Sequence, residues 1–383
     1  MICGGGIAAV EGLLRLRKLA GDSIDIAILA PNEELILRPL AVRQPFAGGP
    51  PNHYPLKRIA ADNDAEWLKD SLSWVDPDGQ VVHTETGQQL RFDALLIAVG
   101  ARQLAPFDHV QTFRDAEADK VFQGVVQDIE EGYSNSIAFL APEGRVYPLP
   151  LYELALLTAE RARSMDIDLK VTLVTPEDRP LSVFGSKVSD AVTALLNRAG
   201  VTVYSSAKAE VPAAGRLVVE PPGVELHPQR MLAVPRLTGP GVRGLPGGGA
   251  HGFLPIDRYC CVAAATSGRV FAAGDAAEFP IKHGGLGAQM ADSAASAIAA
   301  LAGQDIEPEP FHPVIRGKLL GGKDPLFISA RLIGASGFES EVYDTPPWPE
   351  GEKVVATELG GYLAQLDEAA RRTAGRASSA VDR

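Results

Sequence analysis

A glycine-rich turn near the start of the chain has the spacing of a dinucleotide-binding fingerprint. Gly4, Gly5, Gly6 and Ala9 fit the pattern G-x-G-x-x-G/A. Glycine at position 4 permits a tight turn, glycine at position 6 lets a pyrophosphate approach the backbone, and a small residue at position 9 lets the next helix lie close to the strand. The free N–H groups at the start of that helix can meet phosphate charge. The pattern predicts a dinucleotide site, although an ordinary glycine turn would also satisfy it.

A second candidate stretch lies far along the chain, at residues 270–275, with the sequence Val-Phe-Ala-Ala-Gly-Asp. The apolar and small residues predict a buried strand that Gly274 ends. Asp275 then places a short carboxylate at the strand tip, where it can accept from a ligand hydroxyl or serve as a helix N-cap. Ala98 and Gly100 end another apolar strand and allow a ligand to approach the backbone, or form a plain glycine turn.

Two β-α-β units position these turns. Residues 2–29 predict the first unit, but the acidic residue expected at the tip of its second strand is displaced to Glu33, which follows Ala30 and Asn32. Glu33 or backbone groups would then have to meet a ribose. Residues 136–175 predict the second unit.

The glycine positions of the second unit are filled. When Glu153 is aligned with Glu11 of the first unit, those positions carry Val146, Pro148 and Leu151. A proline removes an N–H donor, and the other side chains obstruct a close backbone approach. NAD(P)H binding at this turn is possible but not favoured. The aromatic and proline cluster from Tyr147 to Tyr152 could instead frame a slot for a flat acceptor.

Composition narrows the function classes. The chain has 383 residues and a net charge of −12, which argues against nucleic acid and against an anionic membrane. Three cysteines form no C-x-x-C pair, and neither a signal peptide nor a membrane-spanning run is present, so we expect a cytoplasmic protein. The seven histidines are scattered, which predicts no metal site.

The order of motifs over nearly the whole chain resembles the pyridine nucleotide-disulfide oxidoreductase superfamily. Residues 95–100 (LLIAVG) are similar to the family's LLIATG, and residues 270–275 to its VFAAGD. Residues 280–286 (PIKHGGL) are similar to PVKQGG of the branch that holds type II NADH dehydrogenases and sulfide:quinone oxidoreductases, and residues 345–363 resemble its C-terminal segment.

The resemblance implies an α/β fold with two Rossmann-like FAD/NAD(P)-binding domains and a small C-terminal segment. The FAD-binding domain would be discontinuous, over residues 1–106 and 250–310, and an NAD(P)-binding-like domain would span 107–249. A hairpin and a helix would make up residues 311–383. We expect the helix over 353–372, with an apolar side that packs on the body or on a second copy, as in a homodimer. Peripheral membrane contact is the less favoured alternative.

FAD is the cofactor that the resemblance implies, with a backbone contact to the adenine at Leu72, Arg38 and Pro39 beside the flavin, and Asp275 on a ribityl hydroxyl. The residues assigned to FAD are Gly4, Gly5, Gly6, Ala9, Ala30, Arg38, Pro39, Leu72, Ala98, Gly100, Gly274, Asp275, Gly285 and Leu286.

Three residues are the candidate catalytic groups. Glu153 would face the flavin as a proton relay, or else be a helix-start glutamate favoured by the dipole. Lys282 would add to the positive helix end beside the flavin, or lie solvated at the surface. His283 would handle a proton next to the flavin.

The function implied is an FAD-dependent oxidoreductase that passes electrons from a small reductant to a quinone or a protein carrier. A type II NADH dehydrogenase-like NAD(P)H:quinone reductase and an FAD-stabilised binding protein with little turnover are the alternatives. Disulfide reductase and sulfide oxidation chemistry are disfavoured, because Cys3, Cys260 and Cys261 occupy none of the positions those reactions need.

Overall fold

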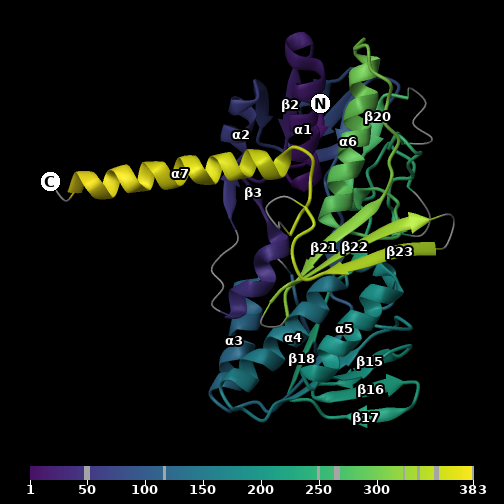
Figure 1. The fold of residues 1–383 in the computed structure, drawn as a ribbon. Helices are drawn as coiled ribbons and strands as arrows, with labels where there is room; N and C mark the ends of the chain where they lie inside the picture. The colour runs from purple at the N-terminus through teal and green to yellow at the C-terminus, as the bar shows by residue number, and fades with distance from the viewer. Residues whose placement is uncertain are drawn as a thin grey trace.

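A five-stranded parallel sheet forms the upper part of the molecule (Figure 1). Strand β1 lies at its centre, although it has only two residues, because Ile2 pairs with both Ile28 and Leu96. In sheet order the strands are β20 (Val270–Ala272), β9 (Leu95–Ile97), β1 (Ile2–Cys3), β2 (Ile26–Leu29) and β5 (Ala65–Leu68). The late strand β20 pairs with β9, so a segment far along the chain completes the sheet that the N-terminus begins.

Helices α1 (Ile7–Ala20) and α6 (Gly284–Leu301) lie side by side on this sheet, and α2 (Leu56–Asp62) packs next to β5. Close packing of α1 depends on Gly12, because a Cβ there would meet Leu96 Cδ2 at 2.6 Å. Shorter strands surround the core: the β3 (Glu34–Ile36)–β4 (His53–Pro55) pair, and the antiparallel sheet β6 (Leu72–Asp76), β7 (Val81–Thr84) and β8 (Gln89–Arg91).

A second five-stranded parallel sheet forms the lower part. Its order is β11 (Gln111–Thr112), β18 (Arg230–Ala233), β12 (Ser136–Leu140), β13 (Lys170–Val174) and β14 (Thr202–Tyr204). Helices α3 (Ala118–Glu130), α4 (Leu149–Ser164) and α5 (Ser186–Arg198) cover it, and β15 (Lys208–Ala213), β16 (Arg216–Glu220) and β17 (Val224–Leu226) form a meander. The two parts are joined by the antiparallel pair β10 (Arg102–Leu104) and β19 (Arg236–Thr238).

The structure, a computed structural model, describes residues 1–46, 52–114, 118–247, 251–262, 268–321, 324–333, 337–348 and 353–381. Residue 250, the expected start of the returning segment, lies outside these ranges, as does part of the C-terminal stretch 345–363 on which the family resemblance draws. The α/β class and the two Rossmann-like sheets are confirmed. The boundaries between the domains remain predictions.

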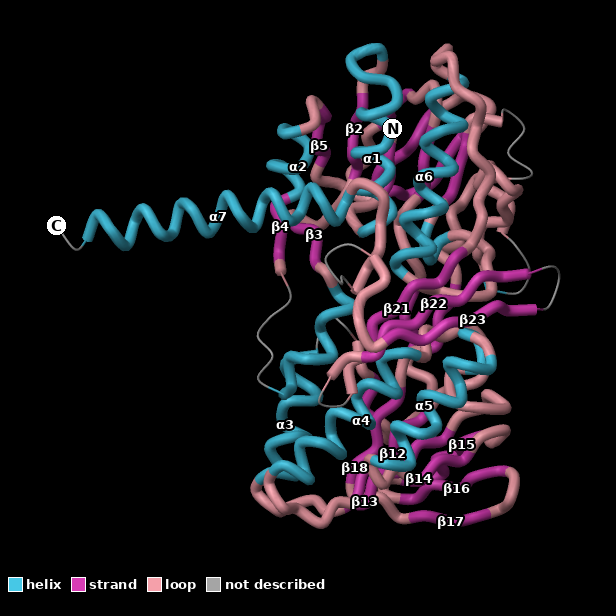
Figure 2. The backbone as a smooth tube through the Cα atoms, in the orientation of Figure 1, coloured by secondary structure: helices cyan, strands magenta, loops and turns pink. Residues whose placement is uncertain are grey.

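The C-terminal segment contains the expected hairpin, β21 (Val314–Leu319) with β22 (Leu326–Ile333), but adds a third strand and starts its helix later. With β23 (Gly337–Tyr343) the hairpin forms a three-stranded sheet that lies against the second part of the chain (Figure 2). The helix α7 starts at Leu359 and runs to Val381, six residues later than the expected start at 353. Leu359, Leu363 and Leu366 join the first core, and the helix then extends away from the body.

The late start of α7 has a physical cause at its first turn. The buried carboxylate of Glu11 accepts hydrogen bonds from the backbone N–H groups of Thr357, Glu358 and Leu359, at 2.7–2.9 Å. An acceptor from outside the helix therefore satisfies the free donors of the helix start. The residues before this point, Lys353 to Ala356, form an irregular strap and are not part of the helix.

Candidate cofactor site

A cavity of about 560 Å³ opens at the carboxyl ends of the strands of the first sheet. Its walls come from the turns after β1, β2, β9 and β20, which parallel pairing brings to one edge. The volume lies in the usual range for a small-molecule or cofactor site. The predicted residues that line it are Gly4, Gly5, Gly6, Arg38, Pro39, Leu72, Ala98, Gly100, Gly274, Asp275, Lys282 and His283.

The glycine turn is shaped to leave space in front of the first helix. Gly4 has φ +131, and a Cβ there would lie 2.2 Å from the carbonyl oxygen of Ala98, so the tight approach to β9 requires glycine. A Cβ on Gly6 would meet no atom within 4 Å. The space beside Gly6 therefore belongs to the cavity, as a pyrophosphate cradle requires.

Two helix starts meet at this cavity. Helix α1 has Gly6 as its N-cap, with no side-chain cap and no acidic residue in its first turn, so its first N–H groups face the cavity without a side-chain acceptor. Gly284 and Gly287, in the first turn of α6, also line the cavity. Two positive helix ends favour a ligand that carries negative charge.

The carboxylate of Asp275 has no hydrogen-bond or ion-pair partner among the described residues, although it lines the cavity. Burial raises its pKa, while the positive charges of Lys282 and Arg38 oppose that shift. An acceptor left without a donor fits a ligand hydroxyl at this strand tip. The carboxylate of Asp275, unpaired within the described part of the chain, and the space beside Gly6 together fit a dinucleotide that carries a polyol chain.

Lys282 is buried rather than solvated. Its ammonium group donates to the carbonyl oxygens of Asp275, at 3.1 Å, and Ala277, and lies 3.8 Å from the centroid of the Phe253 ring. Burial lowers its pKa to about 8, with a further contribution from Arg145, while Asp275 acts in the opposite direction. A lysine with this pKa can gain or lose a proton close to neutral pH.

His283 is the N-cap of α6. Its Nδ1 accepts the backbone N–H of Gly285 at 3.1 Å, so the neutral ring carries its proton on Nε2. Burial and the neighbouring charge of Lys353 lower its pKa to about 4. Tyr147 packs edge-on against the ring, with centroids 5.7 Å apart. At neutral pH the imidazole is therefore a hydrogen-bond donor and not a source of acidic protons.

Glu153 is fully buried but does not line the cavity. Its two carboxylate oxygens lie 2.8 and 2.7 Å from the ammonium of Lys353, and it also accepts the N–H of Leu320 at 2.9 Å. Burial raises the pKa of Glu153, and Lys353 opposes the shift. The contacts bind α4 to the C-terminal strap, and they turn the carboxylate away from the position expected of a proton relay.

Four further predicted FAD residues lie behind the lining rather than in it: Ala9, Ala30, Gly285 and Leu286. Ala9 is fully buried at the contact of α1 with the sheet, as its small size predicted. Glu33 points away from the cavity and pairs with Lys69, whereas Glu34 lines the cavity and lies 2.7 Å from His53 Nδ1. The acid near the expected ribose position is therefore Glu34.

Several lining residues were not predicted. Some lie in the strands β6, β10 and β19, and the others lie in turns or at the start of α4. They include Asn32, Ser71, Ser73, Glu85, Arg102, Gln103, Tyr147, Pro150, Leu237 and Val242. Of these, Tyr147 and Pro150 carried a signal in the sequence, as part of the aromatic and proline cluster, whereas Tyr152 of that cluster is fully buried and does not line the cavity. The others reach the cavity through the packing of the two sheets.

None of the cysteines is among the residues that line the cavity. All three are free thiols, and burial raises the pKa of Cys3 and Cys260 to about 12. A thiol with so high a pKa is a poor nucleophile. The described residues contain no group of three or more His, Cys, Asp or Glu that could hold a metal ion.

No family model and no curated protein matches the sequence. Solved structures do match. The structure of the sulfide:quinone oxidoreductase from the hyperthermophilic bacterium Aquifex aeolicus superimposes with a TM-score of 0.80 at 18% identity, over 90% of this chain and 86% of that one. The chain has the sulfide:quinone oxidoreductase fold.

Two other structures share this fold with the chain. A ferredoxin reductase for the CYP199A2 system from Rhodopseudomonas palustris gives a TM-score of 0.68 at 18% identity, over 90% of this chain and 88% of that one. An NAD-dependent persulfide reductase from A. fulgidus gives 0.63 at 17% identity, over 87% of this chain and 64% of that one. These three structures confirm the predicted two-domain α/β fold.

Proposed function

We propose that the cavity of the first domain binds FAD and that the protein is an FAD-dependent oxidoreductase. The observation that carries the proposal is the meeting of Gly4–Gly6 with Gly274 and Asp275, from opposite ends of the chain, around one cavity. Structures of a sulfide:quinone oxidoreductase, a ferredoxin reductase and a persulfide reductase share the fold, which supports a redox role.

Different residues of the cavity contact different parts of FAD. The free N–H groups at the start of α1 bind the pyrophosphate in the space beside Gly6, and Asp275 accepts a ribityl hydroxyl. Leu72 lies on the adenine side, while Arg38 and Pro39 lie on the flavin side. When bound, FAD supplies a ring that takes up two electrons and releases them.

Protein side chains supply charge and protons beside the ring. The positive start of α6 and the buried ammonium of Lys282 stabilise negative charge at that end of the cavity. Lys282 can exchange a proton near neutral pH, and the Nε2–H of His283 is left able to donate, because Nδ1 accepts the N–H of Gly285. Glu153 acts on the site indirectly, because its partner Lys353 lies in the strap that covers the start of α6.

The electron donor is a small reductant and the acceptor a quinone or a protein carrier. A thiol-based transfer is not part of the proposal, since Cys3 and Cys260 are buried with raised pKa values and the half-buried Cys261 does not line the cavity. In the described chain no helix combines the length and the apolar character needed to cross a bilayer. A cytoplasmic location and a homodimer remain part of the proposal.

An anaerobic titration of the purified protein tests the function. FAD should copurify, and its visible absorbance should be bleached by a reductant and restored by a quinone or ferredoxin-type carrier. NADH, NADPH and sulfide are compared, with dithionite as a control for reducibility. Rapid bleaching by NADH would favour the NADH dehydrogenase-like alternative, and bound FAD that only dithionite reduces would favour a binding protein. Pure folded protein that takes up no FAD would contradict the proposal.

A further inference from the structure

The second domain contains a buried tyrosine and glutamate pair that the proposed function does not use. Tyr152 lies in the first turn of α4 and is fully buried. Its hydroxyl donates to the carboxylate of Glu177, which also accepts from the hydroxyl of Thr175 at 3.3 Å. The backbone N–H of Glu177 returns to the Thr175 hydroxyl at 3.2 Å. The carboxylate is thus held in an internal network.

Glu177 lies at a position in its β-α-β unit where dinucleotide-binding proteins carry a functional acid. The unit β12–α4–β13 is the first β-α-β of the second parallel sheet, and Glu177 follows the end of β13 by three residues. In a dinucleotide-binding unit the carboxylate after this second strand holds the ribose hydroxyls of the nucleotide, and the helix start holds its pyrophosphate. Glu177 therefore stands at the position of the ribose-binding acid, but its hydrogen bonds go to protein hydroxyls.

Side chains also fill the start of α4, where the pyrophosphate of a nucleotide would bind. Leu149 and Leu151 are buried in the second core, whereas in the first domain the space beside Gly6 is empty within 4 Å of an added Cβ. Aligning Glu153 with Glu11 places Tyr152 opposite Val10, whose aliphatic side chain has no hydroxyl to donate. Burial and the Glu177 charge raise the pKa of the Tyr152 phenol well above its usual value, so it stays protonated as a donor.

We propose that Tyr152 is a specificity-determining residue that excludes pyridine nucleotides, because its phenol takes the place of the nucleotide ribose on Glu177. The donor of the proposed flavin reaction, on which this inference rests, is then not NAD(P)H. The closed loop at Val146, Pro148 and Leu151 blocks the pyrophosphate, and Tyr152 blocks the ribose, so the two obstacles are separable by mutation.

The test restores the loop with and without Tyr152. Variant one carries Val146→Gly, Pro148→Gly and Leu151→Gly, and variant two adds Tyr152→Val, the residue found at the equivalent position of the first domain. NADH binding to the FAD-loaded proteins is measured by calorimetry. We expect no measurable binding for the wild type or for variant one, a gain of at least about tenfold in affinity for variant two, and loss of that gain on adding Glu177→Gln.

Equal NADH affinity in variants one and two would overturn the proposal, as would wild-type binding that Tyr152→Val leaves unchanged. If the glycine variants do not fold by circular dichroism, the wild type and Tyr152→Val are compared by saturation-transfer NMR with adenosine, a ribose ligand that has no pyrophosphate for the closed loop to block. A signal for the variant and none for the wild type supports the proposal, and equal signals contradict it. Flavin content is recorded separately. A protein without FAD would refute the proposed function, while the nucleotide-binding measurement would still test whether Tyr152 excludes pyridine nucleotides.

Discussion

At the scale of single residues, two features of the cavity point to a ligand: the free space beside Gly6 and the carboxylate of Asp275, unpaired in the part of the chain that the structure describes. Gly6 lacks a side chain where the structure leaves space, and the Asp275 carboxylate lacks a donor among the described residues where it faces that space. In the proposed function, one ligand with a pyrophosphate and a hydroxyl chain meets both positions. Each can be tested by a substitution that leaves the surrounding packing in place.

Gly6→Leu should abolish FAD binding without unfolding the protein. An added Cβ at this position meets no protein atom, so the leucine fills the cradle in front of α1 rather than the core. Flavin content per protein and the thermal midpoint are measured together. Gly124→Leu is the matched control, since a Cβ on this exposed helical glycine also meets nothing within 4 Å, far from the cavity. Full flavin content in Gly6→Leu would refute the cofactor assignment.

Asp275→Ala should weaken FAD binding by about 10- to 100-fold, because a hydrogen bond to a charged group contributes about 1.5–3 kcal/mol. Asp275→Asn retains an acceptor oxygen and should lose less. Apoprotein is titrated with FAD and followed by quenching of flavin fluorescence. If the alanine variant binds FAD as tightly as the wild type, Asp275 is a turn residue and nothing more.

At the scale of elements, the C-terminal strap ties the two sheets together through one buried ion pair. Lys353 and Glu153 are 3% and 0% exposed, and the strap continues past Val354 and Val355, which lie against Gly284 and Gly285 at the start of α6. The late start of α7 follows from this arrangement. Sequence periodicity predicts a helix from residue 353, but contacts of this strap with Glu153 and Glu11 keep residues 353–358 out of the helix.

Lys353→Met should destabilise the protein by about 3–5 kcal/mol, because it leaves the carboxylate of Glu153 buried without a counter-charge. The double variant Glu153→Leu, Lys353→Met removes both charges and should cost much less than the sum of its single substitutions. Denaturant unfolding monitored by circular dichroism gives the three free energies. Additive costs would show that the pair is not coupled.

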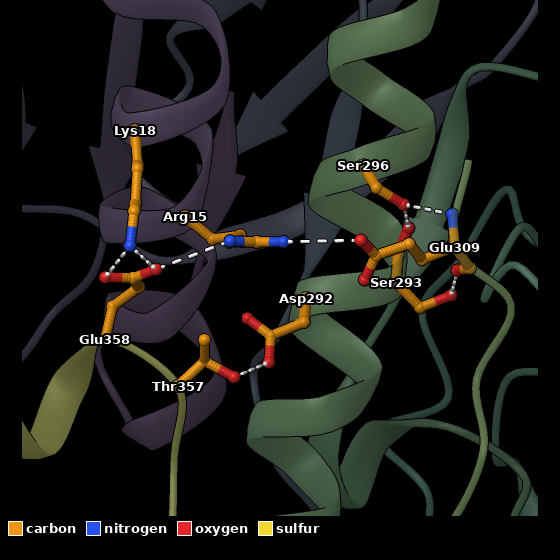
Figure 3. A network of polar contacts seen from close by, with 8 residues as sticks. All are labelled: Arg15, Lys18, Asp292, Ser293, Ser296, Glu309, Thr357 and Glu358. Carbon is orange, nitrogen blue, oxygen red and sulfur yellow. Dashed lines mark hydrogen bonds and ion pairs between the residues drawn. The ribbon is translucent and has the colours of Figure 1, made fainter. Parts of the chain in front are cut away.

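At the scale of the whole molecule, a polar network joins α1, α6 and the tail (Figure 3). Arg15 and Lys18 on α1 hold Glu358, at 3.4 and 2.8 Å, and Asp292 on α6 accepts the hydroxyl of Thr357 at 2.6 Å. The other oxygen of Asp292 is buried and meets no hydrogen-bond partner among the residues that the structure describes. Burial, with the Asp292 charge second, raises the pKa of Glu11 from 4.5 to about 8.

Because the folded state holds this proton more tightly than the unfolded chain, the contribution of Glu11 to stability should fall as pH rises from about 4.5 to about 8. Asp292→Asn supplies a neutral partner in place of the second carboxylate, so it should flatten this dependence and stabilise the protein by about 1–3 kcal/mol at the alkaline end. Thermal midpoints are measured across the range, with the exposed Asp305→Asn as control. Parallel curves for wild type and Asp292→Asn would contradict this account.

The sequence by itself determined the local chemistry of the fold. Glycines at 4 and 6, the strand tip at Gly274 and Asp275, and the filled turn at Val146, Pro148 and Leu151 follow from local rules of turn geometry and steric size. These rules depend on neighbouring residues only. They sufficed to predict two β-α-β units and the sheet edge at which the cavity lies.

Only the tertiary structure decided how distant side chains are paired. It turned Glu153 toward Lys353, buried Lys282 against Phe253, brought Glu34 rather than Glu33 to the cavity, and placed Tyr152 on Glu177. It also started α7 at Leu359, where the carboxylate of Glu11 meets the free N–H groups. A buried charge takes the nearest compensating donor in space, and no local sequence pattern specifies which distant residue that will be.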